Sequence, residues 1–400
     1  MRLQIAIIAS GVLSRRRRAR GLIASWMAAS LVLASATPSP AQTFPSSTGN
    51  IILETVAKGL DHPWALAFLP DGRLLVTERP GRMRIVANEG KISPAIAGVP
   101  KVFASGQGGL HDVILDRDYA DNHTIYFCYA EPAGGGGRTA LARARLLDEG
   151  MSRLDDVAVI LHQEGPLSSG NHFGCRIVQT PDNNLFLTLG DHFTTRNQAQ
   201  NLANHLGKIV RIRPDGSVPP DNPFVGKQGA KPEIWSFGHR NPQGLALHPV
   251  TGKLWEHEHG PRGGDEVNII EKGKNYGWPV IGYGIDYNGA KIHESTHKEG
   301  MEQPIWYWVP SVAPSGMAFY SSKPVSKLAW QFVRRRTCRA DACAARARRG
   351  KGAQGRATVA AAARAHPRCP PGSGRRAVAR HRQQRWPHPA LETGVITQKP

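Results

Sequence analysis

From about residue 50 onward, the hydrophobic positions follow the short-range pattern of β-strands. Apolar runs are separated by turns rich in Pro, Gly, Asp and Asn, and no amphipathic pattern continues for more than two or three helical turns. The pattern therefore predicts an all-β protein built from short strands.

Three segments form a loose repeat: "WALAFLPDGRLLVTERP" (Trp64–Pro80), "CRIVQTPDNNLFLTLGD" (Cys175–Asp191) and "GLALHPVTGKLWEHEHG" (Gly244–Gly260). Each contains a strand, a tight turn with a proline, a second strand and a polar exit, which is the pattern of a β-hairpin. Because long Gly-rich connections separate the copies, the repeat favours a β-propeller over an up-and-down barrel or a sandwich.

The glycine-rich stretch "EPAGGGGRTALARARL" (Glu131–Leu146) is predicted to be a flexible hairpin loop followed by a strand. A phosphate-binding loop needs a strand before it and a helix after it, and neither is indicated here.

The N-terminus has the layout of a secretory signal. A basic "RRRRAR" precedes a mostly apolar run from Gly21 to about Ala34, and small residues follow up to Gln42. A membrane anchor is the alternative, but this run is shorter than the ~20 residues that span a bilayer. We expect residues 1–41 to be a signal peptide cleaved near Ala41, and the mature protein to be periplasmic or secreted without stable membrane insertion.

The net charge of +20 is concentrated at the two ends of the chain. Residues 1–42 contain six Arg and no acid, residues 331–400 contain 17 Lys or Arg and two acids, and residues 43–330 contain 28 basic and 29 acidic residues. Since the body is close to neutral, the charge gives no support for a nucleic acid as partner.

Only two of the five cysteines, Cys128 and Cys175, lie in the body, and both are in strand-like runs. Export would permit a disulfide between them. Two half-buried free thiols are an equal alternative, because the sequence does not give the Cα separation that a bridge requires.

After about residue 325 the strand pattern stops, and residues 326–400 are rich in Arg, Ala and Pro. One interpretation is a disordered basic tail. The other is a frameshift, since one shifted reading frame over two segments of the tail can encode "Arg-Ile-Arg-Asp-Val-Arg" and a turn-rich strand. The hypothesis is that the last blades of a propeller spanning residues 45–325 are missing or disrupted, and sequencing of the locus tests it.

Polar side chains gather where predicted strands begin or end. His172 in "SGNHFGCRIV" precedes a strand, Asp191 in "TLGD" follows one, and the loop "WSFGHRNPQG" carries Arg240, Asn241 and Gln243. A neutral imidazole is the side chain best suited to accept a proton near neutral pH. A single histidine is more often structural, so it is the neighbouring polar groups that make His172 a candidate base.

The loop "EHEHGPRGGDEVNII" (Glu256–Ile270) offers ligands for a metal ion. His257 and His259 alternate at strand spacing and would suit zinc, but no cysteine or third histidine is placed to complete a tetrahedral site. The carbonyls of Gly260 and Pro261 together with Glu266 provide the oxygen donors that calcium prefers. A solvated acidic turn is the alternative.

Six motifs, "GQGGLHDV", "NHFGCRI", "TLGDH", "FGHRNPQGLA", "EHGPRGGDEVN" and "KNYGWP", occur in this order over residues 50 to about 320. Their combination resembles the soluble PQQ-dependent aldose sugar dehydrogenases of the quinoprotein glucose/sorbosone dehydrogenase family. The resemblance implies a six-bladed β-propeller with pyrroloquinoline quinone (PQQ) and Ca²⁺ at one end face. It also implies an aldose sugar as substrate and an external electron acceptor, either a cytochrome, a quinone or a dye.

The resemblance also implies a role for each candidate residue. His172 would be the general base, and Arg240 would polarise the quinone carbonyl. Asn241 and Gln107 would hold the polar edge of the cofactor, Asp191 would support His172, and Gln243 is a further cofactor candidate. Gly260 and Pro261 would bind the cofactor's calcium, and Glu266 and Tyr276 match positions that hold calcium.

The sequence departs from the family after the break, where the basic residues that bind the PQQ carboxylates have no counterpart. Two other functions therefore stay open. One is a lactonase-type propeller hydrolase that uses calcium without a quinone, and the other is an inactive or non-catalytic sugar-binding propeller.

Overall fold

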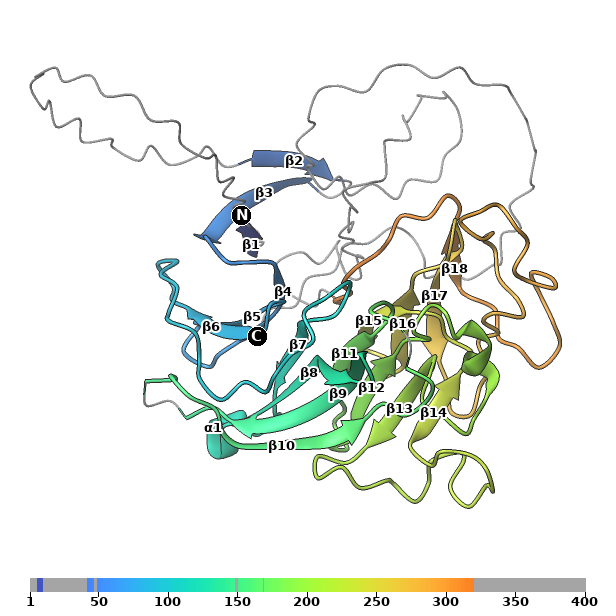
Figure 1. The fold of residues 1–400 in the computed structure, drawn as a ribbon. Helices are drawn as coiled ribbons and strands as arrows, with labels where there is room; N and C mark the ends of the chain where they lie inside the picture. The colour runs from blue at the N-terminus through green and yellow to red at the C-terminus, as the bar shows by residue number, and fades with distance from the viewer. Residues whose placement is uncertain (1–5, 10–41, 47–48, 148–149, 168, 320–400) are drawn as a thin grey trace, which may run out of the picture.

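The computed structural model describes residues 6–9, 42–46, 49–147, 150–167 and 169–319 (Figure 1). The predicted tail at residues 326–400 lies outside the described residues. So does the predicted signal peptide at residues 1–41, apart from β1 (Ala6–Ala9), which pairs with β3 (Gly49–Lys58) beside β2 (Gln42–Ser46). No helix within the described residues is long and apolar enough to cross a membrane.

Four antiparallel sheets, each with its strands in chain order, make up the body of the protein (Figure 1). The first sheet has three strands and the next three have four strands each. Their bounds are β4 (Pro63–Phe68), β5 (Leu74–Glu78), β6 (Arg82–Val86); β7 (Leu110–Leu115), β8 (Thr124–Ala133), β9 (Gly136–Arg145), β10 (Asp155–His162); β11 (Gly174–Gln179), β12 (Leu185–Leu189), β13 (Lys208–Ile212), β14 (Ile234–Phe237); β15 (Pro242–Leu247), β16 (Leu254–Glu258), β17 (Asp265–Ile270) and β18 (Trp306–Trp308).

The sheets are arranged as blades of a β-propeller. The first strands of successive sheets, β4, β7, β11 and β15, lie next to one another, as the innermost strands around a propeller axis do. The three repeated sequence segments are the hairpins β4–β5, β11–β12 and β15–β16, so the prediction of an all-β propeller is confirmed. The described residues contain four blades, and the count of six is not reached within them.

Helical structure among the described residues is limited to α1 (Tyr119–Asn122) and the 3₁₀ turn η1 (Arg196–Gln200). The glycine-rich stretch forms the turn between β8 and β9, where Gly134 and Gly135 adopt φ of 56° and 83°. Positive φ is strained for residues with a side chain, which explains glycine at this turn. The expectation of a hairpin rather than a phosphate loop is thus confirmed.

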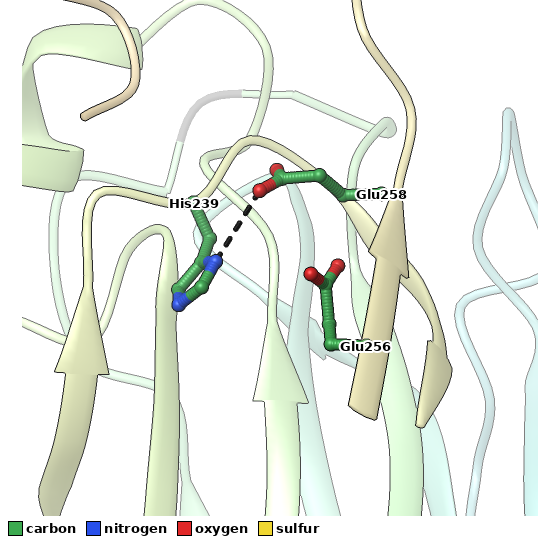
Figure 2. Close-up of side chains that lie close together, drawn as sticks. All are labelled: His239, Glu256 and Glu258. Carbon is green, nitrogen blue, oxygen red and sulfur yellow. Dashed lines mark hydrogen bonds and ion pairs between the residues drawn. The ribbon is translucent and has the colours of Figure 1, made fainter. Parts of the chain in front are cut away.

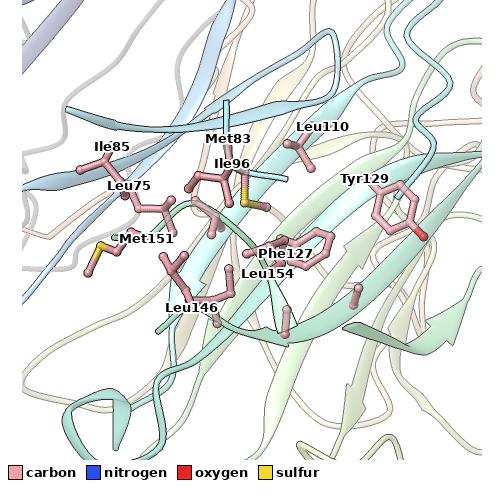
Figure 3. Close-up of a cluster of buried hydrophobic side chains, with 14 of the residues drawn as sticks. Leu75, Met83, Ile85, Ile96, Leu110, Phe127, Tyr129, Leu146, Met151 and Leu154 are labelled. Carbon is pink, nitrogen blue, oxygen red and sulfur yellow. The ribbon is translucent and has the colours of Figure 1, made fainter. Parts of the chain in front are cut away.

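Apolar side chains pack between neighbouring blades. Alternate residues of one strand serve two different interfaces, because successive side chains point to opposite faces of a sheet. On β8, Phe127 and Tyr129 pack toward the first blade, as Figure 3 shows, whereas Tyr126 and Cys128 pack toward the third. Strands covered on both faces are therefore buried along their length, as in "LLVTE" of β5 and "LFLTL" of β12.

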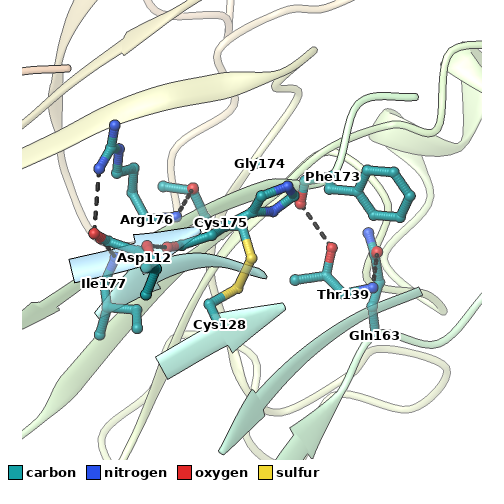
Figure 4. The surroundings of a disulfide bond; sticks show 12 residues. Asp112, Cys128, Thr139, Gln163, Phe173, Gly174, Cys175, Arg176 and Ile177 are labelled. Carbon is teal, nitrogen blue, oxygen red and sulfur yellow. Dashed lines mark hydrogen bonds and ion pairs between the residues drawn. A yellow bond between two sulfur atoms is a disulfide. The ribbon is translucent and has the colours of Figure 1, made fainter. Parts of the chain in front are cut away.

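A disulfide joins the second and third blades (Figure 4). It links Cys128 on β8 to Cys175 on β11, with a Cα–Cα distance of 5.6 Å and a sequence separation of 47. Of the two alternatives that the sequence left open, a disulfide and two free thiols, the structure shows the disulfide. Cys175 lies on β11, three residues after His172, so the bond anchors the strand that directly follows the candidate base.

Candidate active site

The candidate residues lie at one end of the propeller because of where they stand on the hairpins. His172 precedes β11 and Asp191 follows β12, while Arg240 precedes β15 and Gly260 follows β16. In an antiparallel hairpin, the start of the first strand and the end of the second lie at the same edge. The main-chain N–H of Asp191 donates to the carbonyl of Arg240 over 2.9 Å, which joins these edges of the third and fourth blades.

His172 and Asp191 form a buried pair at this end of the propeller. His172 Nδ1 lies 2.6 Å from Asp191 Oδ1, and the two residues are 4% and 0% exposed. The second carboxylate oxygen of Asp191 accepts a hydrogen bond from Trp278 Nε1 over 2.7 Å. Asp191 therefore fixes the imidazole ring on one side and is itself fixed on the other.

The backbone around His172 is held in a tight conformation. His172 has a φ of 55°, in the left-handed region, and its N–H donates to Gln107 Oε1 over 2.8 Å. A Cβ atom at Gly190 would lie 1.9 Å from the carbonyl oxygen of His172, so only glycine fits before Asp191. Gln107 thus contacts the backbone of the candidate base, which is a positioning role.

Burial sets the protonation state of the pair. Desolvation, helped by the positive charge of Arg240, lowers the pKa of His172 to about 4, while Asp191 opposes the shift. For Asp191, burial acts to raise the pKa, but His172 and Arg240 outweigh it, and the pKa falls below its usual value. At pH 7 the pair is therefore a neutral imidazole beside a carboxylate.

Arg240 is buried and its guanidinium is held by main-chain oxygens. Its NH1 group donates to the carbonyls of His259 and Gly260 over 2.9 and 2.8 Å, and the guanidinium carbon lies 5.3 Å from the ring centroid of Trp278. The main-chain N–H of Arg240 donates to the carboxylate of Glu258. Arg240 is thus a buried cation, and its guanidinium group is held in one orientation by these contacts.

Asn241 and Gln243, which follow Arg240, connect two blades. Asn241 Oδ1 accepts hydrogen bonds from the N–H of Gly174 over 3.2 Å and from Gln243 Nε2 over 3.1 Å. Gln243 Nε2 also lies 3.2 Å from the carbonyl oxygen of Gly174. The polar group in "HRNPQG" is therefore held between loops rather than turned to water.

One pocket brings the predicted metal residues together with Arg240. Its lining includes Gly260, Pro261, Glu266 and Tyr276. Desolvation and then the charge of Glu258 raise the pKa of Glu266 well above its usual value. The Tyr276 hydroxyl donates to the carbonyl of Ile269 over 2.6 Å and accepts from the N–H of Glu271 over 2.8 Å. Because the hydroxyl is engaged in both bonds, the main-chain carbonyl oxygen is the Tyr276 atom that could bind a metal ion.

Asp265 fixes the loop that carries the two carbonyls. This fully buried carboxylate accepts from the N–H of Gly260 over 2.9 Å and also holds Ser311, Val312 and Ala313. His259 is occupied as well, with its Nε2 2.5 Å from the carbonyl oxygen of Pro314. His257 and His259 therefore do not form a zinc pair with a third His, Cys or carboxylate among the described residues.

Three residues of the site, Trp278, Glu258 and Asp265, were not among the candidates from the sequence. Each stands inside or beside a motif, Trp278 in "KNYGWP" and the two acids around "EHGPRGGDE", so a signal was present. Their roles depend on contacts with residues distant in the chain, such as the 87-residue separation of Trp278 and Asp191.

The chain is similar to known sugar dehydrogenases. The family model "Glucose / Sorbosone dehydrogenase" matches residues 60–334. Aldose sugar dehydrogenase YliI of Escherichia coli (strain K12) is 46% identical over 281 residues, which are 69% of this chain and 75% of that protein.

Solved structures agree with this match. The soluble aldose sugar dehydrogenase from Escherichia coli in the apo-form gives a TM-score of 0.66 at 46% identity, covering 68% of this chain and 78% of that one. The PQQ-bound form of aldose sugar dehydrogenase from Streptomyces coelicolor gives a TM-score of 0.56 at 32% identity, covering 67% of this chain and 74% of that one.

The fold and the end-face site define a β-propeller with a buried His–Asp pair beside an arginine and an oxygen-lined pocket. Because the family model also matches most of the chain, the chain belongs to the glucose/sorbosone dehydrogenase family and is a dehydrogenase. The resemblance drawn from the six motifs is confirmed.

Proposed function

We propose that this chain oxidises aldose sugars at the anomeric carbon to lactones, with PQQ and Ca²⁺ bound in the pocket beside Arg240. The observation that carries the proposal is the placement of a neutral His172, fixed by Asp191, at the same end of the propeller as the buried Arg240. Six blades in the complete propeller are part of the same proposal.

The residues of the pocket fit the two groups. An anionic quinone needs a buried cation, and Arg240 is 4% exposed with its guanidinium directed by main-chain oxygens. Calcium needs hard oxygen donors, and Gly260, Pro261 and Glu266 line the same pocket. When bound, PQQ supplies the acceptor for a hydride from the anomeric carbon, and Ca²⁺ acts on it as a Lewis acid.

The role of His172 follows from its hydrogen bond. Asp191 is ionised and can only accept, so the hydrogen of the neutral imidazole lies on Nδ1. Nε2 then carries the free lone pair and takes the proton of the anomeric hydroxyl as the C–H bond breaks. Asp191 keeps the tautomer and stabilises the imidazolium that forms, as the acid of a catalytic triad does.

Two exposed aromatic side chains, Phe193 against His172 and Tyr287 against Phe193, suit a sugar. The ring of Phe193 meets the imidazole edge to face at a centroid distance of 5.1 Å, and Phe193 is 42% exposed. Tyr287 lies 6.3 Å from Phe193 and is 55% exposed. Flat apolar rings beside a proton acceptor can cover the C–H face of a pyranose, so we infer that Phe193 contacts the substrate.

Export to the periplasm or the medium is also a proposal. It is supported by the signal-like N-terminus and by the Cys128–Cys175 disulfide, because such bonds persist in oxidising compartments. An external electron acceptor would reoxidise the cofactor there.

The test is to add PQQ and Ca²⁺ to the purified protein and to follow quinone absorbance and dye-linked aldose oxidation. Both signals are expected. Lactone hydrolysis with Ca²⁺ alone would favour the lactonase alternative, and sugar binding without turnover would favour a non-catalytic propeller.

A further inference from the structure

A second group of metal-ligand side chains lies next to the cofactor pocket. Ligand-type atoms of His239, Glu256 and Glu258 all lie within 4.8 Å of one another (Figure 2). His239 and Glu256 are 0% exposed and Glu258 is 4% exposed. Neither His239 nor Glu256 lines the pocket that contains Gly260 and Pro261, so the cluster extends beyond that pocket.

Two oxygen atoms beside this cluster have no hydrogen-bond partner in the part of the chain that the structure describes. Glu256 Oε1 and Asn268 Oδ1 are buried and accept no hydrogen bond from the described residues. The two residues face each other across the β16–β17 pair, where Asn268 Nδ2 donates to Glu256 Oε2 over 3.1 Å. Buried oxygens without a partner are costly, and a carboxylate oxygen is the most costly of them. A cation between them would satisfy both.

The ring of His239 is oriented as in a metal-binding histidine. Its Nε2 lies 2.9 Å from the buried hydroxyl of Ser236, and its Nδ1 faces Glu258 Oε1 at 3.3 Å. When Nε2 donates to Ser236, the lone pair of Nδ1 points toward the carboxylates. A hydrogen bond at the second nitrogen commonly fixes a histidine that binds a metal through the first. The Tyr276 ring stacks on the imidazole at 4.8 Å and helps to exclude water.

We propose that His239 Nδ1, Glu256 Oε1, Glu258 Oε1 and Asn268 Oδ1 bind one divalent first-row metal ion. The imidazole nitrogen favours such an ion over calcium, which takes oxygen ligands. Two carboxylates balance the charge of the ion.

The ion has a structural role. Oε2 of Glu258 accepts the main-chain N–H groups of Arg240 and Asn241, so fixing this carboxylate also fixes the loop that carries both residues. The site thus fastens the segment from His239 to Asn241 to β16. The proposed metal site is inferred from the contacts of these residues alone and does not depend on the identity of the sugar or of the quinone.

The experiment measures Mn²⁺ bound to the full-length protein after EDTA treatment, removal of the chelator and addition of saturating Ca²⁺. One Mn²⁺ per chain is expected to remain bound in the excess of calcium. Glu256→Gln should weaken Mn²⁺ binding at least about 10-fold, because loss of even a hydrogen-bond partner of a metal ligand typically costs that much. Glu271→Gln is the matched control, because Glu271 pairs with Lys253 at an exposed position of the same blade. This control should retain the ion.

Electron spin echo spectroscopy of the Mn²⁺-loaded wild-type protein gives a second readout that needs no variant. Coupling to one imidazole nitrogen is expected. The proposal is overturned if calcium displaces all the Mn²⁺, which would assign the ion to the oxygen-lined pocket, or if bound Mn²⁺ shows no nitrogen coupling. Absence of any Mn²⁺ binding would also overturn it and would leave a proton on Glu256 as the group that relieves the buried carboxylates.

Discussion

His172 and Asp191 meet through a 2.6 Å hydrogen bond between Nδ1 and Oδ1, and both side chains are buried. The bond leaves Nε2 of His172 as its free nitrogen. We predict that His172→Ala lowers kcat by roughly 10²-fold or more, the scale of a lost general base. PQQ binding, measured by absorbance, should persist because Arg240 and the Gly260 loop keep their own contacts. Turnover close to that of the wild type would remove His172 from the mechanism.

The pH dependence should reflect the depressed pKa of His172. Catalysis needs the neutral imidazole, and burial together with Arg240 lowers its pKa to about 4. We therefore expect kcat/KM to be nearly flat from pH 7 down to about 5 and to fall about tenfold per pH unit only below 4. A histidine with an ordinary pKa would place this fall near pH 6.5. Activity regained on return to pH 7 is the control against acid unfolding.

Asp191→Asn tests the direction in which the Asp191 carboxylate shifts the pKa of His172. The carboxylate of Asp191 raises the pKa of His172, so its removal should move the acid limb to still lower pH while kcat falls through loss of the tautomer. An acid limb displaced upward would contradict this assignment.

The hairpins could be predicted because strand alternation and turn residues are local properties. The candidate residues around His172 and Arg240 could be predicted because they stand at strand ends in recognisable motifs. Trp278 could not, because its contact with Asp191 arises only when separate blades meet. His239 could not either, because its contact with Glu258 depends on how the loop before β15 folds against the end of β16. The Cys128–Cys175 bond likewise needed the Cα separation that the fold provides.

Removal of calcium should show which of the two proposed metal sites catalysis needs, the oxygen-lined pocket or the site at His239, Glu256 and Glu258. EGTA, which prefers calcium, is expected to abolish dye-linked activity, and Ca²⁺ should restore it better than Zn²⁺ because Gly260, Pro261 and Glu266 offer hard oxygen donors. Glu266→Gln should raise the Ca²⁺ concentration needed for half-maximal activity. Full recovery with Zn²⁺ alone would indicate a site built on His257 and His259 instead.

Phe193→Ala tests the proposed contact with the sugar. The exposed ring packs against the imidazole of His172 but forms no part of the His172–Asp191 bond. We expect KM for aldoses to rise about tenfold, the scale of one lost aromatic contact of about 1 kcal/mol or slightly more, with a smaller effect on kcat. Phe193→Tyr, which keeps the ring, is the matched control. An unchanged KM in the alanine variant would place the sugar elsewhere.

The disulfide links Cys128 to Cys175, which are 47 positions apart in the chain. Cross-linking of this length restricts the unfolded chain and typically contributes about 2–4 kcal/mol. The double variant Cys128→Ser, Cys175→Ser should therefore unfold at lower urea concentration than the wild type. Both sulfurs are buried at 0% exposure, so dithiothreitol should act on the wild type only once urea opens the fold. It should then bring the wild-type midpoint to that of the double variant and leave the variant unchanged. Equal midpoints for oxidised wild type and variant would show that the bond adds no stability.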